Sequence, residues 1–147
     1  RNIDSVSKGF ATVTKSTGLM GRWQQMQTNP KVVCDTGHNK AGWIDLSKQI
    51  KSQSYKTLRI VFGMVDDKDI HAIMSMLPDD AVYYWTQPST KRAFPVEKIA
   101  SVGAENDLHG RLFTSVKAAY EAALADANPN DFIFIGGSSY VVADFLS

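Results

Sequence analysis

Four short polar segments hold the side chains whose types could do chemistry. Each follows directly on an apolar run, and together they supply glycines, carboxylates, a histidine, hydroxyls and an arginine. Apolar runs of this length are typical of buried strands, and in open α/β sheets ligands bind outside the carboxyl ends of the strands. The layout therefore predicts a nucleotide or small-anion site at one edge of a sheet, built from residues 35–39, 63–66, 86–92 and 136–138.

The first of these segments belongs to the stretch around which the chain is organised, residues 21–45. A buried strand is predicted to end at Asp35, break at a Thr-Gly turn and lead through His38 into a helical pattern. Backbone N–H groups and the positive end of a helix point outward at such a turn, which favours an anionic ligand. The other candidate side chains are Arg22, early in the stretch, and Ser138, after the final apolar run.

Each candidate also has an ordinary structural interpretation. Asp35 can cap the helix that follows it, and Ser138 can cap the last helix in the same way. His38 can be a surface residue at a helix start, and Arg22 can be a solvated strand residue. Residue types and spacing leave these alternatives open.

No metal site or phosphate loop is predicted in this chain. Asp66, Asp67 and Asp69 form an acidic group, but negative charge at a helix start is the better explanation for it. Neither of the other two histidines has zinc-type spacing to the single cysteine. The pattern Gly-x-x-x-x-Gly-Lys-Ser/Thr, which cradles nucleotide phosphates, does not occur in the sequence.

Length and composition indicate one globular domain. The chain has 147 residues, of which 44% are hydrophobic and 21% charged, as in ordinary soluble domains. A net charge of +1 argues against a nucleic-acid partner. No apolar run approaches the roughly 20 residues that cross a bilayer, so no membrane partner is expected. The single cysteine favours a reducing compartment, the cytoplasm, and a first residue Arg1 rather than Met suggests a fragment.

Hydrophobic periodicity predicts an α/β domain, Rossmann-like and three-layered, with helices on both faces of a mainly parallel sheet. A short turn before the second strand makes the first two strands an antiparallel pair at the edge. In the longest predicted helix, over residues 107–127, Leu112 is expected to face the core. The predicted strands cover residues 22–27, 31–35, 57–62, 81–85 and 132–135. The predicted helices cover residues 1–18 (a first or linker helix), 41–50, 94–100 and 107–127, with two more begun by Asp66 and by residues 136–138.

Four motifs occur together in an order and spacing that resemble one known family. They are Gly21-Arg22-Trp23-Gln24, Asp35-Thr36-Gly37-His38-Asn39, Phe62-Gly63-Met64-Val65-Asp66-Asp67-Lys68-Asp69 and Gly137-Ser138-Ser139-Tyr140. Together they resemble the C-terminal domain of folylpolyglutamate synthase/dihydrofolate synthase, a branch of the Mur ligase superfamily. The resemblance covers nearly the whole chain, with residues 19–147 as the domain.

Members of that family join glutamate to a folate or pteroate carboxylate at the expense of ATP, through an acyl phosphate that the glutamate amine attacks. The resemblance implies that the partners are ATP, glutamate, folate or dihydropteroate, and the chain's own N-terminal ATPase domain. That larger domain would carry the phosphate loop, the folate pocket and most of the Mg²⁺ ligands. The present chain alone is then expected to be inactive, and the complete enzyme to be a monomer.

The resemblance also implies roles for the candidate residues. Arg22 would contact the nucleotide and its phosphates, and Asp35 would hold the ribose hydroxyls as a double acceptor. His38, the candidate catalytic residue, would lie near the phosphates or the incoming glutamate. Ser138 is similar to a serine implicated in glutamate binding.

Two departures from the family pattern bear on the alternatives. Lys40 replaces a proline that often follows the His-Asn pair, which alters the charge facing the predicted phosphates. Residues 86–92 lack the Asp-Asn-Pro-Arg motif of several peptidoglycan Mur ligases, which favours the folate branch over a cell-wall ligase acting on UDP-sugar peptides. The second alternative is a non-catalytic α/β binding module, such as a receiver-like domain using Asp66 and Asp67. A receiver has an acidic pair at the end of an early strand and a single Asp at the end of a later one. In this sequence the order of these two is reversed.

Overall fold

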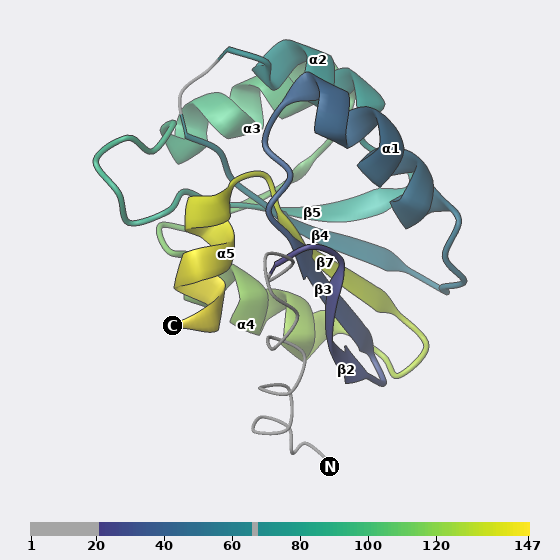
Figure 1. The fold of residues 1–147 in the computed structure, drawn as a ribbon. Helices are drawn as coiled ribbons and strands as arrows, with labels where there is room; N and C mark the ends of the chain where they lie inside the picture. Colours follow the sequence, from purple (N-terminus) through teal and green to yellow (C-terminus); the bar gives the residue numbers. More distant parts are fainter. Residues whose placement is uncertain (1–20, 66–67) are drawn as a thin grey trace.

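A six-stranded sheet forms the centre of the domain, in a computed structural model that describes residues 21–65 and 68–147. Its strands are β2 (Gln24–Thr28), β3 (Lys31–Asp35), β4 (Leu58–Phe62), β5 (Ala81–Trp85), β6 (Gly110–Leu112) and β7 (Phe132–Gly136). They lie in the order β2-β3-β7-β4-β5-β6, as Figure 1 shows. Every neighbouring pair is parallel except the β2–β3 hairpin, so the predicted sheet with one antiparallel edge strand is confirmed.

Helices cover both faces of this sheet. One face carries α1 (Lys40–Lys51), α2 (Ile70–Met76) and α3 (Val96–Glu105), and the other carries α4 (Val116–Asp126) and α5 (Ser139–Leu146) (Figure 1). The central strands are therefore buried on both sides, which explains why they are continuous apolar runs rather than alternating ones. The predicted three-layer architecture is confirmed. Within the described residues, no helix is both long and apolar enough to cross a bilayer.

The carboxyl ends of the parallel strands meet at one edge of the sheet. β7 lies between β3 and β4, and its last residue, Gly136, is level with both Asp35 and Phe62. The loops that follow β3, β4 and β7 consequently leave the sheet next to one another, and the loop after β5 leaves in the same direction. The strand ends at which the sequence predicts a site are thus confirmed as neighbours.

The helix predicted over residues 107–127 is wrong in its first part. Those residues instead form β6, paired with β5, and α4 begins only after Ser115, whose side chain caps it. Leu112, predicted to face inward, is 48% exposed. Gly110 lies so close to the Tyr83 carbonyl that a Cβ atom there would collide with it. This close approach arises because β6 pairs with β5, which is distant in sequence. That pairing prevails over the helical periodicity of the segment.

The turn before β2 also differs from the prediction. The sequence predicts a strand from Arg22, whereas β2 begins at Gln24. Trp23 adopts a left-handed backbone conformation, with φ 43°, which is incompatible with a strand. Arg22 therefore lies in a turn at the edge of the sheet, and its interpretation as a strand residue is wrong.

The remaining boundaries need smaller adjustments. The helix predicted over residues 94–100 is α3, which begins two residues later and extends to residue 105. The helix predicted over residues 1–18 and the cap predicted at Asp66 lie outside the described residues. The helix that Asp66 was expected to start is α2, which begins after Asp69.

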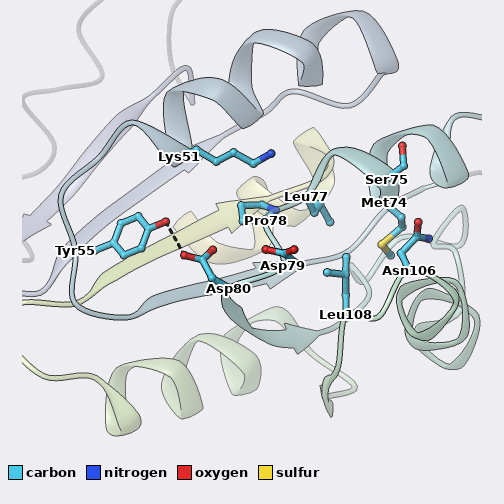
Figure 2. Close-up of a pocket in the computed structure, with 10 residues that line it drawn as sticks. All are labelled: Lys51, Tyr55, Met74, Ser75, Leu77, Pro78, Asp79, Asp80, Asn106 and Leu108. Atoms are coloured by element: carbon cyan, nitrogen blue, oxygen red, sulfur yellow. Dashed lines mark hydrogen bonds between the residues drawn. The ribbon is translucent and has the colours of Figure 1, made fainter.

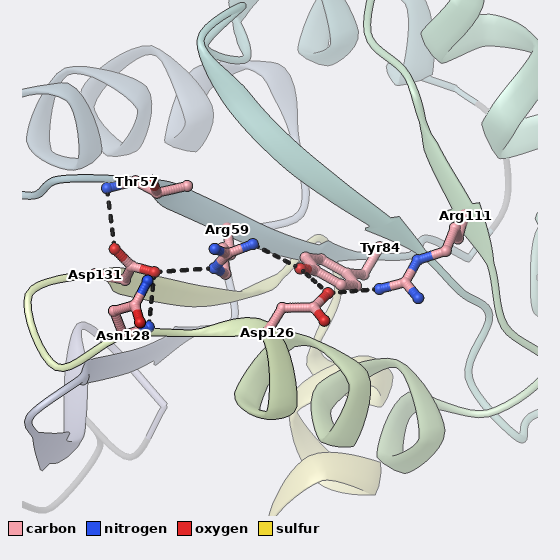
Figure 3. Close-up of polar contacts among 7 residues, drawn as sticks. All are labelled: Thr57, Arg59, Tyr84, Arg111, Asp126, Asn128 and Asp131. Atoms are coloured by element: carbon pink, nitrogen blue, oxygen red, sulfur yellow. Dashed lines mark hydrogen bonds and ion pairs between the residues drawn. The ribbon is translucent and has the colours of Figure 1, made fainter.

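A buried carboxylate joins the starts of β4 and β7. Asp131 accepts the backbone N–H groups of Thr57 at 3.2 Å and Asn128 at 2.9 Å. It also accepts the Nε–H of Arg59 at 3.1 Å, and its side chain is fully shielded from solvent (Figure 3). Because three donors surround this carboxylate, its loss would leave buried polar groups without a partner.

The same network continues from Arg59 toward solvent. Arg59 donates to the Tyr84 hydroxyl at 3.0 Å, and that hydroxyl donates to Asp126 at 2.8 Å. Arg111 pairs with the Asp126 carboxylate at 2.6 Å (Figure 3). Burial, followed by the hydrogen bond to Asp126, raises the pKa of Tyr84, so the phenol remains a donor. The Asp126 side chain is 42% exposed, and the network thus has one buried and one exposed end.

The two ends of this network should differ in their contribution to stability. Asp131→Ala is expected to lower the free energy of unfolding by about 3–5 kcal/mol, because the largely buried Arg59 guanidinium loses its carboxylate partner. Asp126→Ala, the matched control at the exposed end, should cost less than about 1 kcal/mol. Urea unfolding followed by circular dichroism measures both values. Equal losses for the two variants would contradict the buried-carboxylate argument.

Candidate functional site

A hollow of about 470 Å³ opens beside the carboxyl end of β3. The turn before β2, the turn after β3 and one side of α1, as far as Gln49, form its walls. Arg22, Asp35 and His38 all line it, so the structure brings three of the four predicted site residues together. Ser138 does not line it. It lies beyond the end of β7 and is buried.

Asp35 connects the two turns that form this hollow. One carboxylate oxygen accepts the Trp23 N–H and the other accepts the Gly37 N–H, each at 2.8 Å. The alternative that Asp35 caps the following helix is wrong, because the cap of α1 is Asn39, which accepts the Gly42 N–H at 2.9 Å. Bonds from backbone N–H groups to an ionised acceptor are strong ones. Asp35 therefore fixes the turn that carries Arg22 against the turn that leads to His38.

The backbone on the other side of Arg22 is held as well. The Gly21 N–H donates to Oε1 of Gln24 at 2.7 Å, and the Gly21 carbonyl accepts the Thr36 N–H at 2.8 Å. Gln24 is itself buried. The Arg22 side chain is exposed, so its guanidinium projects from a fixed turn toward solvent. Sequence reasoning missed the role of Gln24; its only signal in the sequence is a glutamine two residues after Arg22.

His38 lies at the start of α1. Its side chain is exposed, and the turn before it is packed by Trp43, whose Nε1–H donates to the Gly37 carbonyl at 3.1 Å. The positive end of α1, the Arg22 guanidinium and the His38 imidazole thus border one hollow. Arg22 and the start of α1 suit an anion such as a phosphate group, and the carboxylates of Asp35 and Asp45 line the same hollow.

The other reactive groups at this edge do not add nucleophile or metal chemistry. Burial, with a smaller effect from the charge on Asp35, raises the pKa of Cys34 to about 12. Cys34 is therefore a thiol at neutral pH and not a nucleophile. In residues 21–65 and 68–147, no group of three or more His, Cys, Asp or Glu side chains could hold a metal ion.

Ser138 caps α5. Its Oγ accepts the N–H groups of Tyr140 and Val141, each at 3.1 Å. The capping interpretation of this residue is therefore confirmed. A hydroxyl that accepts two bonds still has its own proton to donate. A role in substrate binding thus remains a prediction alongside the cap.

A larger hollow, of about 610 Å³, lies elsewhere on the domain (Figure 2). It is formed by the end of α1, the turn between α2 and β5 and the segment after α3, so it faces the amino ends of the strands. Tyr55 donates to Asp80 across it at 3.3 Å. None of the predicted site residues lines it. Because ligands of parallel sheets bind at the carboxyl ends of the strands, the smaller hollow is the candidate site.

The sequence matches the family described as Mur ligase, glutamate ligase domain, over residues 21–139. It is 30% identical over 131 residues to the dihydrofolate synthase/folylpolyglutamate synthase of Escherichia coli, a match that covers 87% of this chain and 30% of that protein. The solved structure of Escherichia coli FolC in complex with DHPP and ADP has a TM-score of 0.80 and 28% identity, over 89% of this chain and 31% of that one. A bifunctional folylpolyglutamate synthase/dihydrofolate synthase with Mn, AMPPNP and L-glutamate bound has a TM-score of 0.77 and 26% identity, over 89% and 32%.

The chain spans less than a third of the length of the curated relatives it matches. The family match includes the whole hollow and also Ser138. The resemblance drawn from the four sequence motifs is confirmed by these relatives and by the shared fold. The chain therefore belongs to the Mur ligase family, as a glutamate ligase domain.

Proposed function

We propose that this chain is the C-terminal, nucleotide- and glutamate-binding domain of an ATP-dependent ligase that adds glutamate to folate or dihydropteroate. The observation that carries the proposal is the convergence of Arg22, Asp35 and His38 on one hollow at the end of β3. Its named relatives are folate ligases, and one solved relative holds ADP. The cell-wall ligase and the non-catalytic binding module are weaker alternatives, because no observation favours either.

The chemistry requires two transfers. The γ-phosphoryl group of ATP passes to the folate carboxylate, which releases ADP and forms an acyl phosphate. The glutamate amine then attacks the acyl carbon, an amide bond forms and phosphate leaves. In both steps negative charge is spread over phosphate oxygens, and Arg22 and His38 are the groups in this chain suited to stabilise it.

Asp35 has two tasks in this proposal. Each of its oxygens already accepts one backbone N–H, but a carboxylate oxygen has a second lone pair. Asp35 can therefore accept a ribose hydroxyl while it holds the Arg22 turn. Both tasks require the ionised carboxylate.

The metal and the remaining substrate groups are proposed to bind elsewhere. One solved relative holds Mn with AMPPNP and L-glutamate, which supports a divalent cation in the reaction, with Mg²⁺ as the proposed ion. Since no described cluster of this chain suits a metal, its ligands would come from an N-terminal ATPase domain. Residues 1–18 would then link that domain to residues 19–147 in a monomeric, cytoplasmic enzyme.

The chain alone should bind ATP only weakly. It offers charged groups from one side of the nucleotide and lacks the phosphate loop, whose backbone N–H groups would cradle the phosphates. Isothermal titration calorimetry of the 147-residue chain is expected to give a dissociation constant well above the micromolar range. Micromolar binding by this chain would contradict the proposed division of the site between two domains.

Removal of the Asp35 carboxylate should affect ATP more than glutamate. In the complete ligase, Asp35→Ala is expected to raise KM for ATP roughly ten- to a hundredfold, because a charged acceptor contributes about 1.5–3 kcal/mol. Steady-state kinetics with each substrate varied in turn measures the effect, and circular dichroism checks the fold. An unchanged KM for ATP in a folded variant would rule out the nucleotide role.

Ser138→Ala tests whether the capping serine also binds substrate. Loss of the cap should lower the free energy of unfolding by about 0.5–2 kcal/mol. A neutral hydroxyl contact contributes about 0.5–1.5 kcal/mol of binding free energy. Its loss should therefore raise KM for glutamate several-fold. Ser115→Ala is the matched control, because Ser115 caps α4 with a similar bond and is not a site residue. Both variants should have a lower melting temperature than the parent enzyme. Only Ser138→Ala should change KM for glutamate, and an unchanged value removes the substrate role.

A further inference from the structure

Asp69 holds the start of a helix other than its own. It directly precedes α2, yet its side chain makes no capping bond to that helix. Its Oδ2 instead accepts the backbone N–H of Lys40, the first residue of α1, at 2.9 Å. The loop after β4 is thereby tied to the first turn of a helix that begins 29 residues earlier in the chain.

His38 consequently lies between two backbone groups that carboxylates hold. On one side Asp35 accepts the Gly37 N–H at 2.8 Å, and on the other Asp69 accepts the Lys40 N–H at 2.9 Å. Asn39, the residue between His38 and Lys40, caps α1 from within the same turn. Asp35 ends β3 and Asp69 directly precedes α2, so the His38 turn is held by two other elements and not by α1 alone.

The first residues of the loop after β4 are anchored to their surroundings. The Gly63 N–H donates to the Gly136 carbonyl at 3.3 Å, and the Met64 carbonyl accepts the Phe94 N–H at 2.8 Å. Asp69 lies at the other end of this loop, directly before α2, so its bond to Lys40 joins the start of α1 to the start of α2. Helix ends otherwise fray, since their first N–H groups have no partner within the helix.

We propose that Asp69 is a positioning residue for the nucleotide site: its carboxylate ties the loop after β4 to the first turn of α1 and so fixes His38 beside Arg22 and Asp35. This role rests on the proposed function. Asp69 acts through the Lys40 N–H and does not touch the nucleotide. What matters is therefore an acceptor oxygen at this position, not its charge.

That distinction can be tested because asparagine keeps an acceptor oxygen and removes the charge. In the complete ligase, Asp69→Ala should raise KM for ATP about three- to tenfold, the effect of one lost capping contact. Asp69→Asn should stay within about twofold of the parent enzyme, since its amide oxygen can still accept the Lys40 N–H. A metal ligand or a charged contact to substrate would not be rescued by asparagine.

Ser115→Ala provides the matched control, because it removes an exposed capping bond of the same kind from α4. It should lower the melting temperature as much as Asp69→Ala does and leave KM for ATP unchanged. An equal rise in KM for Ser115→Ala would make the Asp69 effect one of general stability and overturn the proposal. Failure of Asp69→Asn to rescue, or an unchanged KM in Asp69→Ala, would overturn it too.

Two further measurements separate failure of this role from failure of the proposed function. Arg22→Ala should raise KM for ATP; if it does and Asp69→Ala does not, the Asp69 role alone is wrong. If neither variant changes KM for ATP, the nucleotide site itself is wrong. Amide hydrogen exchange over residues 38–42 reports the tie directly: Asp69→Ala should accelerate it and Asp69→Asn should not. Unchanged exchange in Asp69→Ala would show that the tie is absent in solution and overturn the proposal.

Discussion

The position of β7 is the constraint on which the rest of this domain depends. The last strand of the chain inserts between β3 and β4, with Gly136 level with the ends of both neighbours. The chain then turns at Gly137, which has a φ of 112° and approaches the Gly63 carbonyl so closely that no side chain fits. This insertion brings the loops after β3 and β4 to the same edge of the sheet, from opposite sides of β7.

Carboxylates that accept backbone N–H groups join separate segments at both edges of the sheet. Asp35 joins the turns before β2 and after β3, Asp69 joins the loop after β4 to α1, and Asp131 joins the starts of β4 and β7. In each case a single side chain connects segments that are distant in sequence. Arg22 and His38, which have proposed roles in binding, are exposed on the turns before β2 and after β3 that Asp35 joins.

Carboxylates that hold the backbone, together with exposed Arg22 and His38, suit a domain that supplies one side of a shared site. Arg22 and His38 line the hollow, and both side chains are exposed on turns that hydrogen bonds hold in place. In the proposed ligase, closure of a second domain would exclude water and strengthen the electrostatic effect of these groups on the phosphates. Cys34 is a buried thiol and Ser138 caps α5, so both belong to the framework of the domain.

The sequence by itself determined the segments whose structure depends on local patterns. The continuous apolar runs at β3 and β5 predicted both strands with their observed ends, and the motif residues predicted the edge at which Arg22, Asp35 and His38 meet. Tertiary structure alone decided the features that need distant partners. Helical periodicity runs through Leu112, but β6 exists because it can pair with β5. Likewise an acidic residue before α2 is indistinguishable from a local cap until folding places Asp69 against the N–H of Lys40. Local patterns report which face of a segment is apolar; they carry no information on which other segment will supply its hydrogen-bond partner.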